Sequence, residues 1–236
     1  MIDKPAPPAT SKATAPPKPR GADRRRGQYE DQYAALLQQV LSRDGSLDSN
    51  SCAIGLTSCA RKSGVSTVAA NLAVHAADVL DQPVLLVDAN VAHPSMQRTF
   101  GTNGCPGLVE SLSGQALALD CVQSSEVENL SLLTTGSTSA RMRGVYEPKT
   151  LTEFMDVIGG AFGFIVFDLP AVHDLNHCHA LAAGLDGIVL VLEAESAKAE
   201  ESEWAAQRLQ QAGAHLMGVV LNKRRHHVPN WLYRRL

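Results

Sequence analysis

Small and hydroxyl-bearing residues follow the apolar run of residues 53–56. Gly64 comes directly before the loop's end, and Ser66 and Thr67 begin the helical stretch that follows. Residues of this kind let backbone N–H groups surround phosphate oxygens, and a hydroxyl at the start of the helix can hold Mg²⁺. A phosphate loop also carries a lysine just before that hydroxyl, where this chain has Val65. The segment therefore predicts either a phosphate loop without its lysine or an ordinary turn capped by Ser63 or Ser66.

Two carboxylates stand where two apolar runs end. Asp88 follows residues 84–87, and Asp168 follows residues 164–167. Uninterrupted Val, Ile, Leu and Phe runs are typical of parallel strands that are buried on both faces. Because the carboxyl ends of such strands meet at one sheet edge, where ligands bind, we expect both carboxylates there. They suit Mg²⁺ coordination and phosphoryl transfer, and the alternative is that each caps a helix or ends a turn.

Short apolar runs alternate with helical stretches from residue 51 onward. This order predicts a doubly wound α/β fold with a mostly parallel sheet and right-handed crossovers. Residues 29–41 carry apolar side chains at helical spacing, which predicts an amphipathic helix over 28–45. The expected strands are 53–56, 84–87, 130–133, 164–167, 187–192 and 216–221, and the other expected helices are 66–80, 151–158 and 197–211.

Composition divides the chain of 236 residues into a basic arm and one folded domain. Residues 1–27 hold 6 of the 12 prolines and 7 of the 21 Lys and Arg residues, which predicts a disordered arm. The domain is expected over 51–222. Without the arm, the chain has 14 basic and 22 acidic residues, which argues against nucleic-acid binding. Five scattered cysteines, with no apolar leader or membrane-spanning run, indicate the cytoplasm.

Ordered motifs across most of the chain resemble the bacterial tyrosine kinase family of capsule and exopolysaccharide biosynthesis, a branch of the MinD/ParA-like P-loop NTPases. Residues 57–73 are similar to the family pattern TS-x-x-P-G-E-G-K-S/T-x-x-A-x-N-L-A. Residues 84–95 resemble V-L-L-I-D-x-D-L-R-x-P-S, and residues 162–171 resemble F-D-x-V-I-I-D-T-P-P. Residues 107–114 and 218–222 are similar to G-L-x-x-x-L-x-G and G-V-V-L-N. The resemblance implies a P-loop NTPase fold of the SIMIBI type.

The resemblance also implies a site for ATP or ADP with Mg²⁺. In that site Ser66 holds Mg²⁺, Asp88 prepares the acceptor hydroxyl or water, and Asp168 supports the metal. Metal contacts are thus expected from Ser66, Asp88 and Asp168. The residues expected to contact the nucleotide are Gly64, Ser66, Thr67, Lys62 and Asn222, the last at the position that faces adenine in relatives.

Several charges of the family pattern are missing from this chain. Val65 replaces the loop lysine, Asn90 the second acid of the acidic motif, and Ala92 its arginine. Ala34 and Leu37 replace two arginines that the family uses for ring-like self-association. One preorganised charge typically contributes about 10²- to 10³-fold in rate. We therefore predict a catalytically impaired, tyrosine-kinase-like protein that regulates or scaffolds exopolysaccharide or capsule biosynthesis and export.

Two alternative functions stay open. One is an active ATP-dependent tyrosine kinase or ATPase in which Lys62 or Arg61 replaces the loop lysine. The other is a positioning ATPase of the ParA/MinD kind.

The tail, residues 223–236, combines five Lys and Arg residues with Trp231 and Tyr233 and has no acid. It is interpreted as a membrane anchor, a segment that docks on a membrane-spanning adaptor, or a packed terminal helix. The expected partner is a membrane-spanning polysaccharide co-polymerase or adaptor. Self-association and peripheral membrane contact through 223–236 are further expectations. The expected location is the inner face of the plasma membrane, reached through the partner.

Overall fold

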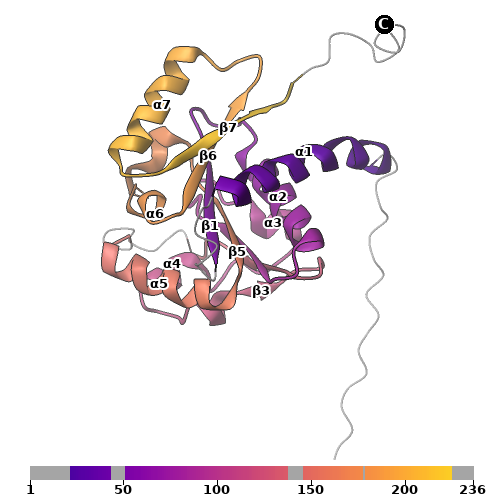
Figure 1. The fold of residues 1–236 in the computed structure, drawn as a ribbon. Helices are drawn as coiled ribbons and strands as arrows, with labels where there is room; N and C mark the ends of the chain where they lie inside the picture. Colours follow the sequence, from indigo (N-terminus) through magenta and orange to yellow (C-terminus); the bar gives the residue numbers. More distant parts are fainter. Residues whose placement is uncertain (1–21, 44–50, 138–145, 178, 225–236) are drawn as a thin grey trace, which may run out of the picture.

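A seven-stranded sheet forms the centre of the computed structural model, which describes residues 22–43, 51–137, 146–177 and 179–224 (Figure 1). The strand order is β3-β4-β2-β5-β1-β6-β7. Neighbouring strands are parallel except for the antiparallel pair β3 and β4. The strands are β1 (Cys52–Ser58), β2 (Val84–Asp88), β3 (Gln123–Ser124), β4 (Leu130–Leu133), β5 (Phe164–Asp168), β6 (Gly187–Glu193) and β7 (Leu216–Asn222).

Helices cover both faces of this sheet. They are α1 (Ala22–Arg43), α2 (Val65–Val79), α3 (Met96–Phe100), α4 (Leu108–Leu112), α5 (Pro148–Ala161), α6 (His179–Ala183) and α7 (Ala199–Gln211), with 3₁₀ turns η1 (Leu119–Cys121) and η2 (Val172–His177). In Figure 1, α1, α2 and α3 lie on one side of the sheet, and α4 to α7 lie on the other. Within the described residues, no helix combines the length and the apolar character needed to cross a membrane.

Strand side chains alternate between two hydrophobic cores. On β2, Leu86 belongs to the core under α1 and α2, whereas Leu85 and Val87 belong to the core under α4 to α7. On β5, Val166 and Phe167 divide in the same way. Because both faces are covered, every residue of β1, β2 and β5 is buried. The predicted doubly wound, mostly parallel α/β fold is therefore confirmed.

The N-terminal helix differs most from the expected pattern. Each strand and helix predicted within 51–222 is present, with ends that differ by at most three residues. The helix expected over 28–45 instead spans Ala22–Arg43, so the prediction of a disordered arm is wrong for residues 22–27. Alanine and arginine are good helix formers, and this segment contains one alanine and three arginines. Residues 1–21 of the arm and 225–236 of the tail lie outside the described residues.

The short helix α4, which carries too little periodicity to be predicted, supports the carboxyl edge of the sheet. Gly107 precedes α4 at a point where its Cα lies against the backbone of residues 134–136. A Cβ added there would lie 2.3 Å from the Gly136 nitrogen and 2.4 Å from the Thr134 oxygen. The Leu108 N–H donates to that Thr134 oxygen at 2.8 Å. The Thr135 hydroxyl in turn donates to the Asp88 carbonyl at 3.0 Å. Close approach at Gly107 therefore helps to hold the end of β2.

We expect Gly107→Ala to destabilise the fold, because the added methyl group must displace backbone rather than a movable side chain. Overpacking of this kind costs about 1–3 kcal/mol, and each kcal/mol lowers the melting temperature of a chain this size by roughly 2–4 °C. The control is Gly160→Ala in α5, where an added Cβ meets nothing within 4 Å. It should leave the melting temperature unchanged or raise it. Equal melting curves for Gly107→Ala and the natural protein would contradict this account.

Candidate functional site

Two buried carboxylates lie side by side at the carboxyl edge of the sheet. Asp88 and Asp168 are register partners at the ends of β2 and β5, and each has 0 % of its surface exposed. The predicted meeting of these two residues is therefore confirmed. Two buried negative charges repel each other and lose their hydration. Each carboxylate therefore needs hydrogen-bond donors, a proton or a cation to stabilise it.

Asp88 receives its compensation from the backbone. Its Oδ1 accepts a hydrogen bond from the Asn90 N–H at 3.2 Å, and its Oδ2 accepts from the Ser95 and Met96 N–H groups at 2.8 and 2.9 Å. Burial raises the pKa of Asp88, and these donors lower it in part. Asp88 thus holds the start of α3, which was the alternative interpretation of this residue.

Asp168 has no such donors. Among the described residues, neither of its carboxylate oxygens has a hydrogen-bond partner of good geometry. Burial, followed by the neighbouring charge of Asp88, raises the pKa of Asp168 to about 8, and the nearby Ser66 hydroxyl lowers it in part. A buried carboxylate that lacks a partner and lies beside a second carboxylate and a hydroxyl fits an oxygen-ligated cation such as Mg²⁺.

The loop between β1 and α2 has the compact shape of an anion-binding turn. Gly64 is the residue before α2 and has φ of 93°, a conformation that favours glycine. The Ser63 hydroxyl donates to the Ala60 carbonyl at 2.8 Å. Within the described part of the chain, no side chain caps α2, so the alternative interpretation of a Ser63 or Ser66 cap is wrong. The first N–H groups of this helix are therefore free of side-chain acceptors and suited to phosphate.

Residues at the end of β7 hold this loop from outside. The Asn222 side-chain amide donates to the Ser63 carbonyl at 2.9 Å. Lys223 Nζ donates to the Lys62 carbonyl at 2.5 Å and lies 3.3 Å from a Glu193 carboxylate oxygen. A Cβ on Gly64 would lie 2.2 Å from Asn222 Nδ2, so Asn222 would have to move, and the φ of 93° is itself a conformation that favours glycine. These residues, which we call the β7 clamp (Asn222 and Lys223), fix the loop carbonyls away from the phosphate side.

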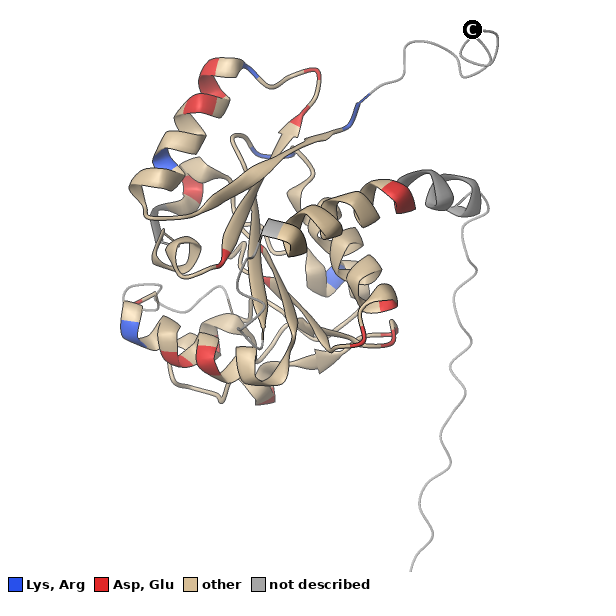
Figure 2. Ribbon diagram, in the orientation of Figure 1, with Lys and Arg blue, Asp and Glu red and all other residues tan. Residues whose placement is uncertain are grey.

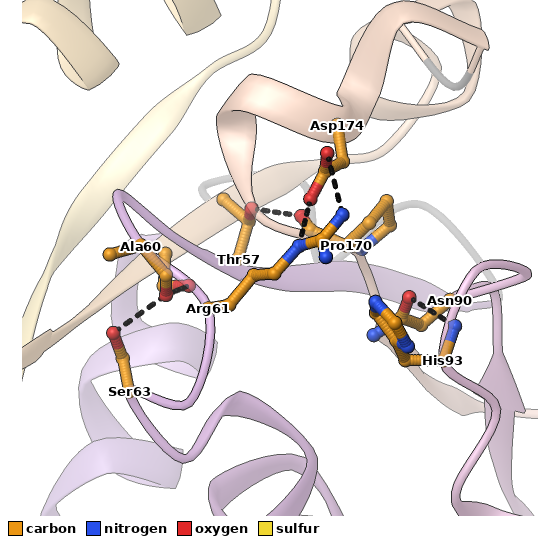
Figure 3. Close-up of polar contacts among 9 residues, drawn as sticks. Thr57, Ala60, Arg61, Ser63, Asn90, His93, Pro170 and Asp174 are labelled. Carbon is orange, nitrogen blue, oxygen red and sulfur yellow. Dashed lines mark hydrogen bonds and ion pairs between the residues drawn. The ribbon is translucent and has the colours of Figure 1, made fainter.

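Arg61, one of the two cations considered as a replacement for the loop lysine, is engaged elsewhere. Figure 3 shows its side chain reaching from the loop toward η2, where Nε and Nη2 donate to Asp174 at 2.9 and 3.2 Å. The hydrogen bond from Arg61 lowers the pKa of Asp174. Both side chains are partly exposed, at 58 % and 30 %, so this ion pair adds little to stability. It nevertheless directs the guanidinium away from the loop.

The structure brings most of the predicted site residues to one place. Ser66, Asp88 and Asp168 meet at the sheet edge, and Gly64, Lys62 and Asn222 meet at the loop. Thr67 lies on the first turn of α2 with an exposed side chain. The sequence analysis missed the supporting roles of Lys223 and Thr135. Only the position of Lys223, directly after the closing strand, could have suggested its role. A cavity of about 800 Å³ lies elsewhere, and none of its lining residues was predicted as a site residue.

We expect Asp168→Asn to stabilise the protein, and increasingly so as the pH rises. Between the ordinary pKa of 3.8 and about 8, the folded protein keeps a proton on Asp168 that the unfolded chain has lost. Stability of the natural protein therefore falls with rising pH in this window, and asparagine removes that dependence. Melting temperatures measured from about pH 5 to about pH 8 should show a growing advantage for Asp168→Asn. Exposed Asp156→Asn is the control, and an advantage that shrinks with pH would contradict the assignment.

We also expect Lys223→Gln to loosen the loop. Loss of one hydrogen bond from a charged donor, with the neighbouring ion pair, costs about 1–2 kcal/mol. Hydrogen–deuterium exchange in peptides covering residues 59–64 should accelerate roughly five- to thirtyfold. Arg224→Gln is the matched control, since it removes a neighbouring exposed positive charge. Equal acceleration in both variants would show that charge alone, and not the contact with the Lys62 carbonyl, stabilises the loop.

Known proteins are similar to this chain in sequence. A ParA family model described as NUBPL iron-transfer P-loop NTPase matches residues 52–232. Tyrosine-protein kinase CpsD of Streptococcus agalactiae is 28 % identical over 171 residues, which are 72 % of this chain and 74 % of that protein.

Solved structures show the same fold. The kinase domain of Escherichia coli tyrosine kinase ETK has a TM-score of 0.76 at 20 % identity and covers 85 % of this chain and 79 % of its own. MinD of Pyrococcus horikoshii, complexed with Mg-ADP, has a TM-score of 0.61 at 23 % identity and covers 78 % and 76 % of the two chains. The chain therefore belongs to the ParA family of P-loop NTPases, and within that family it resembles the bacterial tyrosine kinases.

Proposed function

We propose that this chain is a catalytically impaired, tyrosine-kinase-like P-loop protein that regulates or scaffolds exopolysaccharide or capsule biosynthesis and export. The proposal rests on one observation: the two carboxylates at the sheet edge are present, but the loop has no lysine at the position directly before Ser66. Asp88 and Asp168 remain buried together, whereas Val65 occupies the lysine position. The polysaccharide pathway itself rests on the family resemblance of the sequence motifs.

Nucleotide and Mg²⁺ have identifiable contacts at this site. Asp168 and Ser66 are the residues that would hold Mg²⁺, and the N–H groups at the start of α2 would contact phosphate oxygens. Bound Mg²⁺ supplies positive charge that neutralises the phosphates. Asp88 keeps its carboxylate aimed at the same edge through its three backbone donors. Without a loop lysine, nucleotide affinity is expected to be weak.

One of the two neighbouring cations is engaged elsewhere in this arrangement. Arg61 is paired with Asp174, whereas the contact of Lys62 with Lys223 uses the backbone carbonyl of Lys62 and leaves its side chain as a candidate replacement. Loss of a preorganised charge at a developing negative centre reduces a rate by about 10²- to 10³-fold. Because the Arg61 pair is partly exposed and can open, an active tyrosine kinase or ATPase that uses Lys62 or Arg61 in place of the loop lysine is the competing function. Turnover that disappears in Lys62→Gln or in Arg61→Gln would favour it.

A scaffold of this kind acts through its partners. We propose a membrane-spanning polysaccharide co-polymerase or adaptor as the partner, which would place the protein at the inner face of the plasma membrane. Ala34 and Leu37 replace the assembly arginines of the family pattern, and Leu37 is buried against the sheet. The self-association surface therefore differs from that of the active relatives, and heterotypic contacts are favoured.

Calorimetric binding of ATP with Mg²⁺ tests the proposal on the natural protein and on Val65→Lys. Lysine restores a charge beside the phosphates, so affinity should rise by at least about tenfold, the effect of one modest charge-assisted contact. Val65→Met, of similar length but without charge, should bind like the natural protein. Tyrosine phosphorylation or ATP turnover by the natural protein near 1 s⁻¹, roughly the lower range of kinases, would refute impaired catalysis.

A further inference from the structure

An open groove lies between α1, α2 and the turn before β4, away from the phosphate loop. Its volume is about 800 Å³. Its lining includes Glu30 and Tyr33 of α1, Val74 and Asp78 of α2, and residues 127–129. We call it the α1–α2 groove.

The groove combines negative charge with apolar surface. Among its described lining residues, every Asp, Glu, Lys and Arg side chain is acidic: Glu30, Asp78 and Glu128. Figure 2 shows acidic residues on α1 and on the turn beneath it, at the right of the view. Tyr33 adds an aromatic surface, and its hydroxyl accepts a hydrogen bond from Asn71 at 3.2 Å. An aromatic wall with acidic neighbours suits a proline-rich segment that carries Lys or Arg.

We propose that residues 1–21 of this same chain dock in the α1–α2 groove. That segment holds 6 of the 12 prolines, four Lys and Arg residues and one acid, so its charge and its composition both complement the groove. A proline-rich segment loses little conformational entropy on docking, because its extended conformation is already restricted.

Chain geometry favours this occupant. Twenty-one residues in a polyproline conformation reach about 65 Å, and Glu30 lies only about 12 Å along the helix from Ala22. The arm continues directly from the helix that forms the groove wall, so its effective concentration there is on the order of millimolar. The basic tail instead leaves from β7, at the opposite edge of the sheet from β3 and β4.

Trypsin cleavage after Lys12 in the full-length protein measures whether the arm is docked. We expect slow cleavage in the natural protein. Faster cleavage, by about fivefold or more, is expected in Glu30→Gln/Asp78→Asn/Glu128→Gln, as removal of several surface charge pairs predicts. The control is Asp156→Asn/Glu200→Gln/Glu203→Gln, which neutralises three exposed acids on α5 and α7 and should cleave like the natural protein. Cleavage should also accelerate at about 1 M NaCl, where the Debye length is about 3 Å.

A charge-reversal pair separates docking from damage to the fold. Lys4→Glu/Lys18→Glu should speed cleavage after Lys12, and addition of Asp78→Lys/Glu128→Lys should restore protection. Equal cleavage rates in the natural protein and the groove variant would overturn the proposal. Protection that appears only at high protein concentration would assign the arm to a second copy, which also overturns docking within one chain.

Discussion

The carboxyl edge of the sheet depends on the repulsion between two buried carboxylates, Asp88 and Asp168. Parallel pairing of β2 with β5 places Asp88 opposite Asp168, and burial removes the hydration that would screen their charges. The backbone around α3 compensates Asp88. Within the described residues no backbone group donates to Asp168, and its pKa rises to about 8. An edge built in this way favours a proton or a cation, so the fold itself creates affinity for positive charge.

The phosphate loop lies beside that edge, and contacts with the end of β7 hold its shape. The Lys62 and Ser63 carbonyl groups are held by the β7 clamp, and Gly64 has a φ of 93° that favours glycine. A loop whose carbonyls are engaged on the outside leaves its N–H groups for an anion on the inside. This organisation persists although position 65 is valine. The loop shape therefore depends on backbone and clamp contacts, and the lysine would contribute charge rather than structure.

The distribution of charge connects the site to the rest of the molecule. Lys223 is shared between the Lys62 carbonyl and Glu193, and it directly precedes the basic end of the chain. The C-terminal half of α2 lines the acidic α1–α2 groove, and its first turn adjoins the loop. The β7 clamp and α2 are thus the two elements that connect the phosphate loop to charged surfaces elsewhere in the described structure.

The sequence by itself determined the doubly wound fold, the strand that precedes each carboxylate and the position of the loop. Apolar runs and helical periodicity depend only on local spacing, which is why they could be read directly. The helical start at Ala22 does not follow from composition, because arginine is common both in disordered segments and in helices. Only the tertiary structure decided that Asp168 has no backbone donor among the described residues, that Arg61 turns to Asp174 and that Lys223 holds the loop. These contacts join residues more than 100 positions apart, or depend on a donor being absent, and the packing of distant strands sets both.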